Sequence, residues 1–359
     1  MAIFDPNDLN FNGEEIKNSA EAVFISAFAQ PAVDQLFTIV NGIKSKKQIA
    51  ILGRFNGLLG KGNGGCTPTG REVSTPMTQK IWETATISDR LAYCWTQLED
   101  TFWIWGTKNG IEKADLTATD FVLYIEELLK TELVETYMRI AYFNDLGAEL
   151  VDDGGVVTDG TDLAYFNRID GIWKQAFAIG TAHPERLNGG ILATRNAGAS
   201  YAAQAFTAAD TNNMVVSNLL LDMELSADSR LTSKEGLVFQ VTKSVYDQYR
   251  RELTKANVNF TTERLENGMD MLNAGGIPVV KVEFWDRIIR QYFDSGTKWH
   301  LPHRAILTVP NNIQIGTEEE STFSAYDVFY DKKDKTTYVD FQFDIDAKII
   351  LDHEVQLSY

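Results

Sequence analysis

The stretch Val339-Asp-Phe-Gln-Phe-Asp-Ile-Asp-Ala-Lys-Ile-Ile-Leu351 carries the strongest structural signal in the sequence. Apolar and polar side chains alternate along it with a period of two, which is typical of a β-strand with one buried and one polar face. At 3.3 Å a residue this strand is about 43 Å long, whereas most strands have about five or six residues. The segment 323–330 and the turn 331–335 precede it. We therefore expect the long strand to be one arm of a hairpin.

A second long element is expected between Thr117 and Gly147. Thr117 and Asp120 form a helix-capping signature. About 28 residues at 1.5 Å a residue give a helix of about 42 Å. Because the helix and the long strand are similar in length, we predict that they pack together in one elongated domain. The apolar stripe of this spine helix recurs at helical spacing at Val122, Ile125, Leu129, Leu133, Tyr137 and Ile140.

A basic, glycine-rich segment is predicted to form a long hairpin. Extended runs are expected over 43–52 and 77–87, and seven glycines lie between them at 53, 57, 60, 62, 64, 65 and 70. Structureless loops longer than about 12–15 residues are uncommon and are usually functional. Residues 41–80 contain one acidic side chain, Glu72, and seven basic ones, Lys44, Lys46, Lys47, Arg54, Lys61, Arg71 and Lys80. We take these seven residues as candidates for contacts between subunits.

The rest of the chain is predicted to mix helices and short strands. Asn12 and Glu15 predict an amphipathic N-terminal helix that is interrupted by Pro31. The aromatic segment 88–105 is expected to be buried and helical or mixed. Alternating elements then indicate a compact α/β or α+β domain. Its expected strands are 237–241, 277–284 and 305–309, and its expected helices are 214–223 and one capped by Ser244 that runs to 253.

Charge and composition exclude several classes of protein. The net charge of −17 argues against a surface that grips nucleic acid, because such affinity comes mostly from neutralised phosphates. The basic segment on an acidic body instead favours attraction to another copy of the chain or to an acidic partner. Only Cys66 and Cys94 are present, so no disulfide framework is expected. Neither a membrane-spanning run nor a signal peptide is expected.

Catalytic and metal-binding readings of the sequence are weak, and we predict no catalytic residue, cofactor or metal site. His300 and His303 are three positions apart, but Pro302 between them disfavours a helical metal site. The glycines around Lys61 lack the spacing of a phosphate-binding loop. Asp152 and the aspartates after it lack the calcium-loop pattern, so they are interpreted as turn residues.

The order of elements resembles the major capsid protein of tailed bacteriophages, which has the Hong Kong 97-type fold. Three phrases are also similar to phage capsid sequences: Gly42-Ile-Lys-Ser-Lys-Lys-Gln-Ile49, Phe166-Asn-Arg-Ile-Asp-Gly-Ile-Trp-Lys-Gln175 and Ser244-Val-Tyr-Asp-Gln-Tyr-Arg-Arg251. The resemblance implies an α+β capsid fold with named parts. These are an N-terminal arm (1–40), an extended loop over a neighbouring subunit (41–88), a peripheral domain with the spine helix and long strands (89–146 and 311–359) and an axial domain (147–310).

The resemblance also implies a function and partners. The protein would self-assemble as hexamers and pentamers into the icosahedral head of a tailed phage, in the host bacterial cytoplasm, and would reside in the virion. It would enclose double-stranded DNA without specific binding. Portal, scaffolding and decoration proteins are expected partners, and no membrane is. Some family members crosslink a loop lysine, and Lys61 lies where such a lysine could be, although no motif supports this.

Three other functions stay open from the sequence. Within the same fold, the chain could form an encapsulin-like nanocompartment shell. From different classes, it could be a tail or adaptor protein, or a metal-dependent hydrolase built on His300 and His303. A nanocompartment protein would form closed shells, and a tail or adaptor protein would form tubes or rings. A hydrolase would be a small zinc-binding enzyme.

Overall fold

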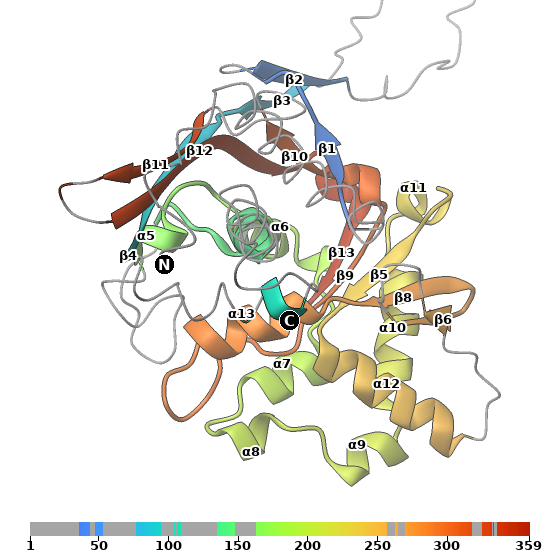
Figure 1. The fold of residues 1–359 in the computed structure, drawn as a ribbon. Helices are drawn as coiled ribbons and strands as arrows, with labels where there is room; N and C mark the ends of the chain where they lie inside the picture. The colour runs from blue at the N-terminus through green and yellow to red at the C-terminus, as the bar shows by residue number, and fades with distance from the viewer. Residues whose placement is uncertain are drawn as a thin grey trace, which may run out of the picture.

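The computed structural model describes residues 36–43, 47–52, 77–94, 104, 106–108, 135–147, 163–256, 263–264, 270–317, 325–331, 333 and 336–359. In that part of the chain, strands and helices build two sheets and a two-stranded ribbon. The ribbon and the sheet built on β12 lie at one end of the molecule, and helices α8, α9 and α12 lie at the other (Figure 1).

The predicted long strand is β12, Thr336–Ile349, and it organises a five-stranded sheet. Its first half pairs with β11 (Ala325–Asp331), which confirms the predicted hairpin. Its second half pairs on the same edge with β10 (Ile313–Thr317), and β10 pairs in parallel with β1 (Thr38–Val40). The other edge pairs with β4 (Ala85–Cys94). At 14 residues β12 is about 46 Å long.

A six-stranded sheet forms the centre of the second half of the chain. Only β5 and β8 run parallel within it. All four residues of β5 and of β9 are buried, since helices cover both faces of this part of the sheet. Its strand order is β13 (Val355–Ser358), β9 (Ala305–Thr308), β5 (Val238–Val241), β8 (Ile277–Lys281), β7 (Asp270–Ala274) and β6 (Glu263–Arg264).

The six-stranded sheet separates two apolar cores. One core contains the helical residues 135–143, α6 (Ile172–Ala182) and α13 (Glu283–Tyr292), packed with the buried face of β12. The other contains α7 (Gly190–Asn196), α10 (Val215–Ser226) and α12 (Lys243–Lys255). Shorter helices complete this half: α5 (Leu163–Phe166), α8 (Tyr201–Gln204), α9 (Ala208–Asn212) and α11 (Ser229–Thr232).

A fully buried arginine holds three segments of the first core together. Arg304 is 1% exposed, and its guanidinium lies over the rings of Phe143, Trp173 and Phe293. Its Nε donates to the carbonyl of Leu301 at 2.7 Å. Burial lowers the pKa of Arg304 to about 9. The cation–π contacts and the carbonyl bond offset part of the cost of removing this charge from water.

Several expectations are confirmed and several are corrected. Helix α10 lies at the helix predicted over 214–223, and β5 and β9 lie at the strands predicted over 237–241 and 305–309. The spine helix is confirmed only where it is described, at residues 135–143, and its first part lies outside the described residues. The N-terminal helix and the aspartate turns after Asp152 lie outside them as well.

Three boundaries were wrong. Residues 88–94 are not a buried helical or mixed segment but the end of strand β4, and Ser88, Asp89 and Arg90 are exposed. Ser244 does not cap α12, because the helix begins at Lys243 after Thr242. The strand predicted over 277–284 ends at Lys281, and Glu283 begins α13, a helix that was not predicted from the sequence. The sequence Val-Glu-Phe extends the alternation of the strand, which hides the change of period.

Candidate assembly surface

The basic segment projects from the five-stranded sheet as a ribbon. β2 (Lys47–Leu52) pairs antiparallel with β3 (Met77–Trp82), as the predicted hairpin requires. Among the described strands these two pair only with each other. The ribbon lies at the edge of the molecule, beyond β1 and β10 (Figure 1).

The seven predicted contact residues are distributed between this ribbon and the segments around it. Lys47 and Lys80 lie on the paired strands, where Lys47 is opposite Trp82 and Lys80 is opposite Ile49. The other five lie outside the described residues: Lys44, Lys46, Arg54, Lys61 and Arg71.

Lys80 is engaged within its own chain at the root of the ribbon. Its Nζ donates to the Asp352 carboxylate at 2.6 Å and to the carbonyl oxygen of Ile349 at 2.5 Å. Its side chain is about one quarter exposed, so this charge-assisted pair is only partly screened by water. Lys80 therefore fastens the ribbon to the end of β12.

Close packing at Gly316 of β10 also holds the root of the ribbon against the five-stranded sheet. Trp82 is 2% exposed and Ile43 is fully buried. A Cβ placed on Gly316 of β10 would lie 2.7 Å from Cδ1 of Ile43 and 2.8 Å from Cζ3 of Trp82. Only glycine fits there without displacing a buried side chain. The indole of Trp82 thus packs directly on the backbone of β10, where the ribbon joins the sheet.

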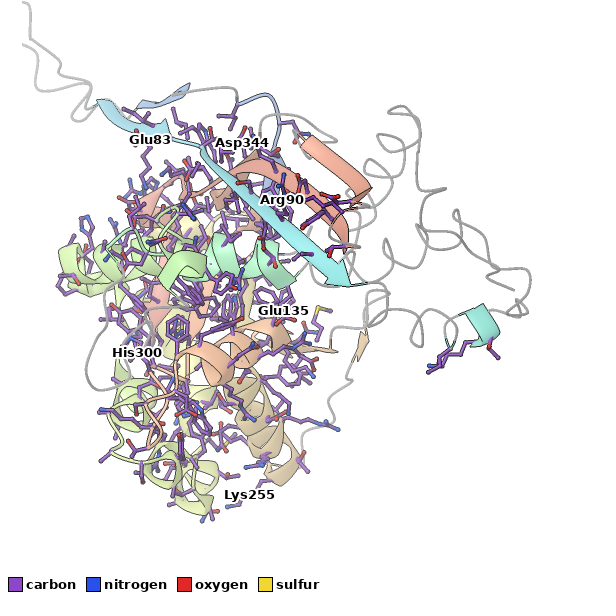
Figure 2. The ribbon with its side chains drawn as sticks, turned by 60° about the vertical axis from the view of Figure 1, so that its left-hand side comes forward. Glu83, Arg90, Glu135, Lys255, His300 and Asp344 are labelled. Carbon is purple, nitrogen blue, oxygen red and sulfur yellow. The ribbon has the colours of Figure 1, made fainter. Side chains whose placement is uncertain are left out.

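A buried carboxylate holds the turn between the ribbon and β4. Asp346 is 1% exposed, and its Oδ2 accepts the backbone N–H of Glu83 at 2.8 Å. Lys348 lies 3.3 Å away on the same strand. Burial raises the pKa of Asp346, whereas the hydrogen bond from Glu83 and the charge of Lys348 oppose that rise. Figure 2 shows Glu83 at the tip of the β4 side of the sheet, with Arg90 and Asp344 further along it.

A shallow groove of about 400 Å³ adjoins the root of the ribbon. One wall is β3, where the side chain of Ile81 is 49% exposed, and the other is α6 with Ala178, Ile179 and Ala182. The groove therefore combines an apolar floor with the charged pair of Lys80 and Asp352 at its edge.

The two histidines considered as metal ligands make packing and hydrogen-bond contacts within the fold. His303 lies 2.7 Å from the Ser244 hydroxyl through Nδ1 and 2.8 Å from the Gln204 carbonyl oxygen through Nε2, so both ring nitrogens are occupied. His300 stacks on the ring of Phe293. Burial lowers the pKa of each histidine to about 4. Within the described ranges, no group of three or more His, Cys, Asp or Glu side chains could hold a metal ion.

The sequence pattern indicates the basic segment but not the residues that anchor it. Asp346 belongs to the polar face of the alternating strand, and nothing in the sequence indicates that it is buried against Glu83. Gly316 and Asp352 carry no local signal either, because their roles depend on segments more than 200 residues away.

Among the residues that the structure describes, no helix is long and apolar enough to cross a lipid bilayer.

Comparison with known proteins gives structural but not sequence relationships. No protein-family model matches the sequence, and no curated protein is similar to it. A chain in the structure titled "Satellite phage P4 procapsid including size determination (Sid) protein" is similar with a TM-score of 0.51 at 12% identity, over 97% of this chain and 98% of that one. A Microbacterium phage Oxtober96 chain has a TM-score of 0.48 at 11% identity, over 92% and 91%. The SrpI encapsulin of Synechococcus elongatus has 0.45 at 10%, over 90% and 85%.

The likeness to the P4 procapsid chain defines the class of the fold. The chain has the α+β fold of tailed-phage major capsid proteins, as the order of its elements predicted. The P4 procapsid chain is matched over almost its whole length, so the likeness includes both sheets and not one common motif.

Proposed function

We propose that the chain is a structural major capsid protein, which self-assembles into the icosahedral head of a tailed phage that encloses double-stranded DNA, and that it has no catalytic role. The observation that carries this proposal is the β2–β3 ribbon. A two-stranded ribbon alone is marginally stable in water, and this one has no third strand among the described strands. Among the described contacts, those of Lys80 and Trp82 fasten it at its root, so we expect a neighbouring surface to cover the rest.

Charge supports a second copy of the chain as that neighbour. Residues 81–162 contain seventeen acidic and five basic side chains, whereas residues 41–80 contain one acidic and seven basic ones. Opposite charges on two parts of one chain favour contacts between copies. Because Lys80 is already bound to Asp352, we assign the contact role first to the other six: Lys44, Lys46, Lys47, Arg54, Lys61 and Arg71.

The proposal includes the parts and partners expected from the resemblance. The N-terminal arm (1–40), the extended loop (41–88), the peripheral domain (89–146 and 311–359) and the axial domain (147–310) would each contact other subunits in hexamers and pentamers. Scaffolding, portal and decoration proteins are further partners. The acidic body suits a wall that encloses DNA without binding it specifically. Assembly would take place in the bacterial cytoplasm and the product would be the virion.

Expression of the full chain in bacteria tests this proposal. Size-exclusion chromatography and negative-stain microscopy should show closed hollow particles, or hexamers and pentamers that close when a scaffolding protein is added. Tubes or isolated rings would indicate a tail or adaptor protein. A monomer that stays monomeric at high concentration would refute assembly.

A further inference from the structure

Helix α10 presents an apolar face to solvent. Leu221 and Leu225 lie one turn apart and are 50% and 74% exposed, although the opposite face of the helix is buried in the second core. Asp222 is exposed beside them, and its carboxylate has no partner in the described part of the chain. A helix that is apolar on both faces is usually covered on both.

Helix α12 presents positive charge, which is complementary to Asp222 of α10. Arg250 and Arg251 are exposed, and neither guanidinium has a hydrogen bond or ion pair with any described residue. Unpaired arginines in a chain of net charge −17 mark a local excess of positive charge. Arg250 and Arg251 follow one another in the outer stripe of α12, next to Lys255 at its end.

A hollow of about 270 Å³ continues this cationic face between α8, α12 and α13. Its apolar lining includes Phe206, Ile289 and Pro302, and Arg251 and Arg290 stand on its walls. Its two carboxylates are already engaged. Asp247 pairs with Lys243 at 2.8 Å, and Asp286 accepts the backbone N–H of Lys243 at 2.5 Å.

The two faces lie on different flanks of α12. Helix α12 contacts α10 on one flank and α13 on another. Figure 1 shows α13 to the left of α12, whereas α10 lies behind and above α12. The acidic–apolar face of α10 and the cationic hollow beside α13 therefore do not meet within one molecule. A second copy, rotated about an axis beside this domain, can bring them together.

We propose that Leu221, Asp222 and Leu225 of one copy dock on the Arg250, Arg251 and Arg290 face of the next copy. The leucines would cover the apolar lining of the hollow, and Asp222 would pair with the unpaired arginines. Such a contact is heterologous and closes into a ring when the rotation allows it. This inference rests on the proposed self-assembly and names the surfaces by which this half of the chain takes part in it.

Charge reversal in the full-length chain tests the pairing. Arg251→Glu and Asp222→Arg are each expected to weaken association between subunits at least tenfold, measured by sedimentation velocity and by the yield of particles. The double variant is expected to recover most of the loss, because the charges attract again with their signs exchanged. Arg168→Glu is the matched control, since Arg168 is exposed and without a described partner but belongs to neither face. All variants should unfold like the wild type.

Cysteine crosslinking tests the geometry independently. In a Cys66→Ser, Cys94→Ser background, Leu225→Cys combined with Arg250→Cys should give a ladder of disulfide-linked oligomers on a non-reducing gel. Each single cysteine should give monomers. Dimers from Leu225→Cys alone would show an isologous contact and overturn the head-to-tail arrangement.

The outcomes separate this inference from the proposed function. A wild type that never assembles would refute the function itself. Assembly that is equal in wild type, Arg251→Glu and Asp222→Arg would refute only the docking surface. If the combined Arg250→Glu, Arg251→Glu variant assembles normally but loses the retardation of duplex DNA in a gel, the cationic face binds DNA and the inference is wrong.

Discussion

At the scale of single residues, Gly316 has a role that no other residue type can fill. Its backbone lies against two buried side chains, Ile43 and Trp82, which flank the ribbon in the sequence and meet at its root. Neither can withdraw into solvent, and the indole is rigid. The glycine is therefore a packing requirement and not a flexible joint.

Gly316→Ala should lower the free energy of unfolding by about 1–3 kcal/mol, because overpacking a buried contact displaces its neighbours. Urea unfolding followed by tryptophan fluorescence measures the effect. Gly147→Ala is the control, since a Cβ at that exposed turn meets only an Asp145 carboxylate oxygen at 3.4 Å. Equal stability of Gly316→Ala and the wild type would contradict the packing of Trp82 on β10.

His303 is one of the histidines whose burial makes stability depend on pH. Its pKa is lowered to about 4 by burial, so between pH 6.5 and pH 4 the unfolded chain binds the proton and the folded chain does not. Stability falls as the pH falls through that window. From pH 7 to pH 5 this one group contributes a loss of about 2 kcal/mol.

His303→Gln should reduce that loss, as measured by urea unfolding at both pH values. His300, with the same lowered pKa, continues to contribute in the variant. Asp286 acts in the opposite sense, because burial raises its pKa to about 6 and its proton stabilises the fold as the pH falls. A pH dependence unchanged by His303→Gln would show that the imidazole is not buried in its neutral form.

At the scale of elements, β12 links the ribbon root, the hairpin and the first core. Its inward face carries Phe343, which is fully buried and stacked on Tyr137 of the helical segment 135–143 at 4.7 Å between ring centroids. Its other face carries Asp344, whose carboxylate accepts a hydrogen bond from Thr86 of β4 near solvent. The strand thus joins the helix on one side and β4 at its edge.

Phe343→Ala should destabilise the protein by about 3–5 kcal/mol, because it leaves a cavity between the helix and the sheet. Asp344→Ala, one position along the same strand, should cost about 1 kcal/mol or less. Thermal unfolding of the pair of variants measures the contrast. Similar losses in both would contradict the register of β12, in which Phe343 faces the core and Asp344 faces solvent.

At the scale of the whole molecule, we expect two parts of the ribbon segment to have different roles. Its root contributes to the stability of the fold, and residues 55–74 contribute to assembly. Its root is held by contacts with β10, the end of β12 and Asp352. The pairing of its two strands extends as far as Leu52 and Met77. Deleting 55–74 would leave Gly53, Arg54, Thr75 and Pro76 between those strands, and loops of four residues are common in hairpins.

The 55–74 deletion should therefore give folded subunits with wild-type circular dichroism that fail to form normal particles in the electron microscope. Replacing the same twenty residues with a glycine–serine segment of equal length is the control, because it keeps the reach but removes Lys61 and Arg71. Normal particles from the deletion would contradict a role for the loop in assembly.

The sequence alone determined the elements whose pattern is local and repetitive. The alternation from Val339 to Leu351 gave the long strand and its hairpin, because a period of two admits one buried face. The glycine-rich basic segment gave a hairpin, since its flanks are extended and its middle is permissive. The order of these elements and three sequence phrases resembled those of phage capsid proteins, and the capsid fold was predicted from that resemblance.

Only the tertiary structure decided what anchors the ribbon and which surfaces stay uncovered. Asp346 has the pattern of any polar residue of an alternating strand, yet it is buried at the turn before β4, where it accepts the N–H of Glu83. Gly316 and Trp82 meet across more than 200 residues, so neither carries a local signal. Leu225 fits the pattern of a core helix, yet it lies in solvent because the sheet covers only the opposite face of α10. Local periodicity fixes which face of an element is apolar, whereas burial depends on what the rest of the chain places against it.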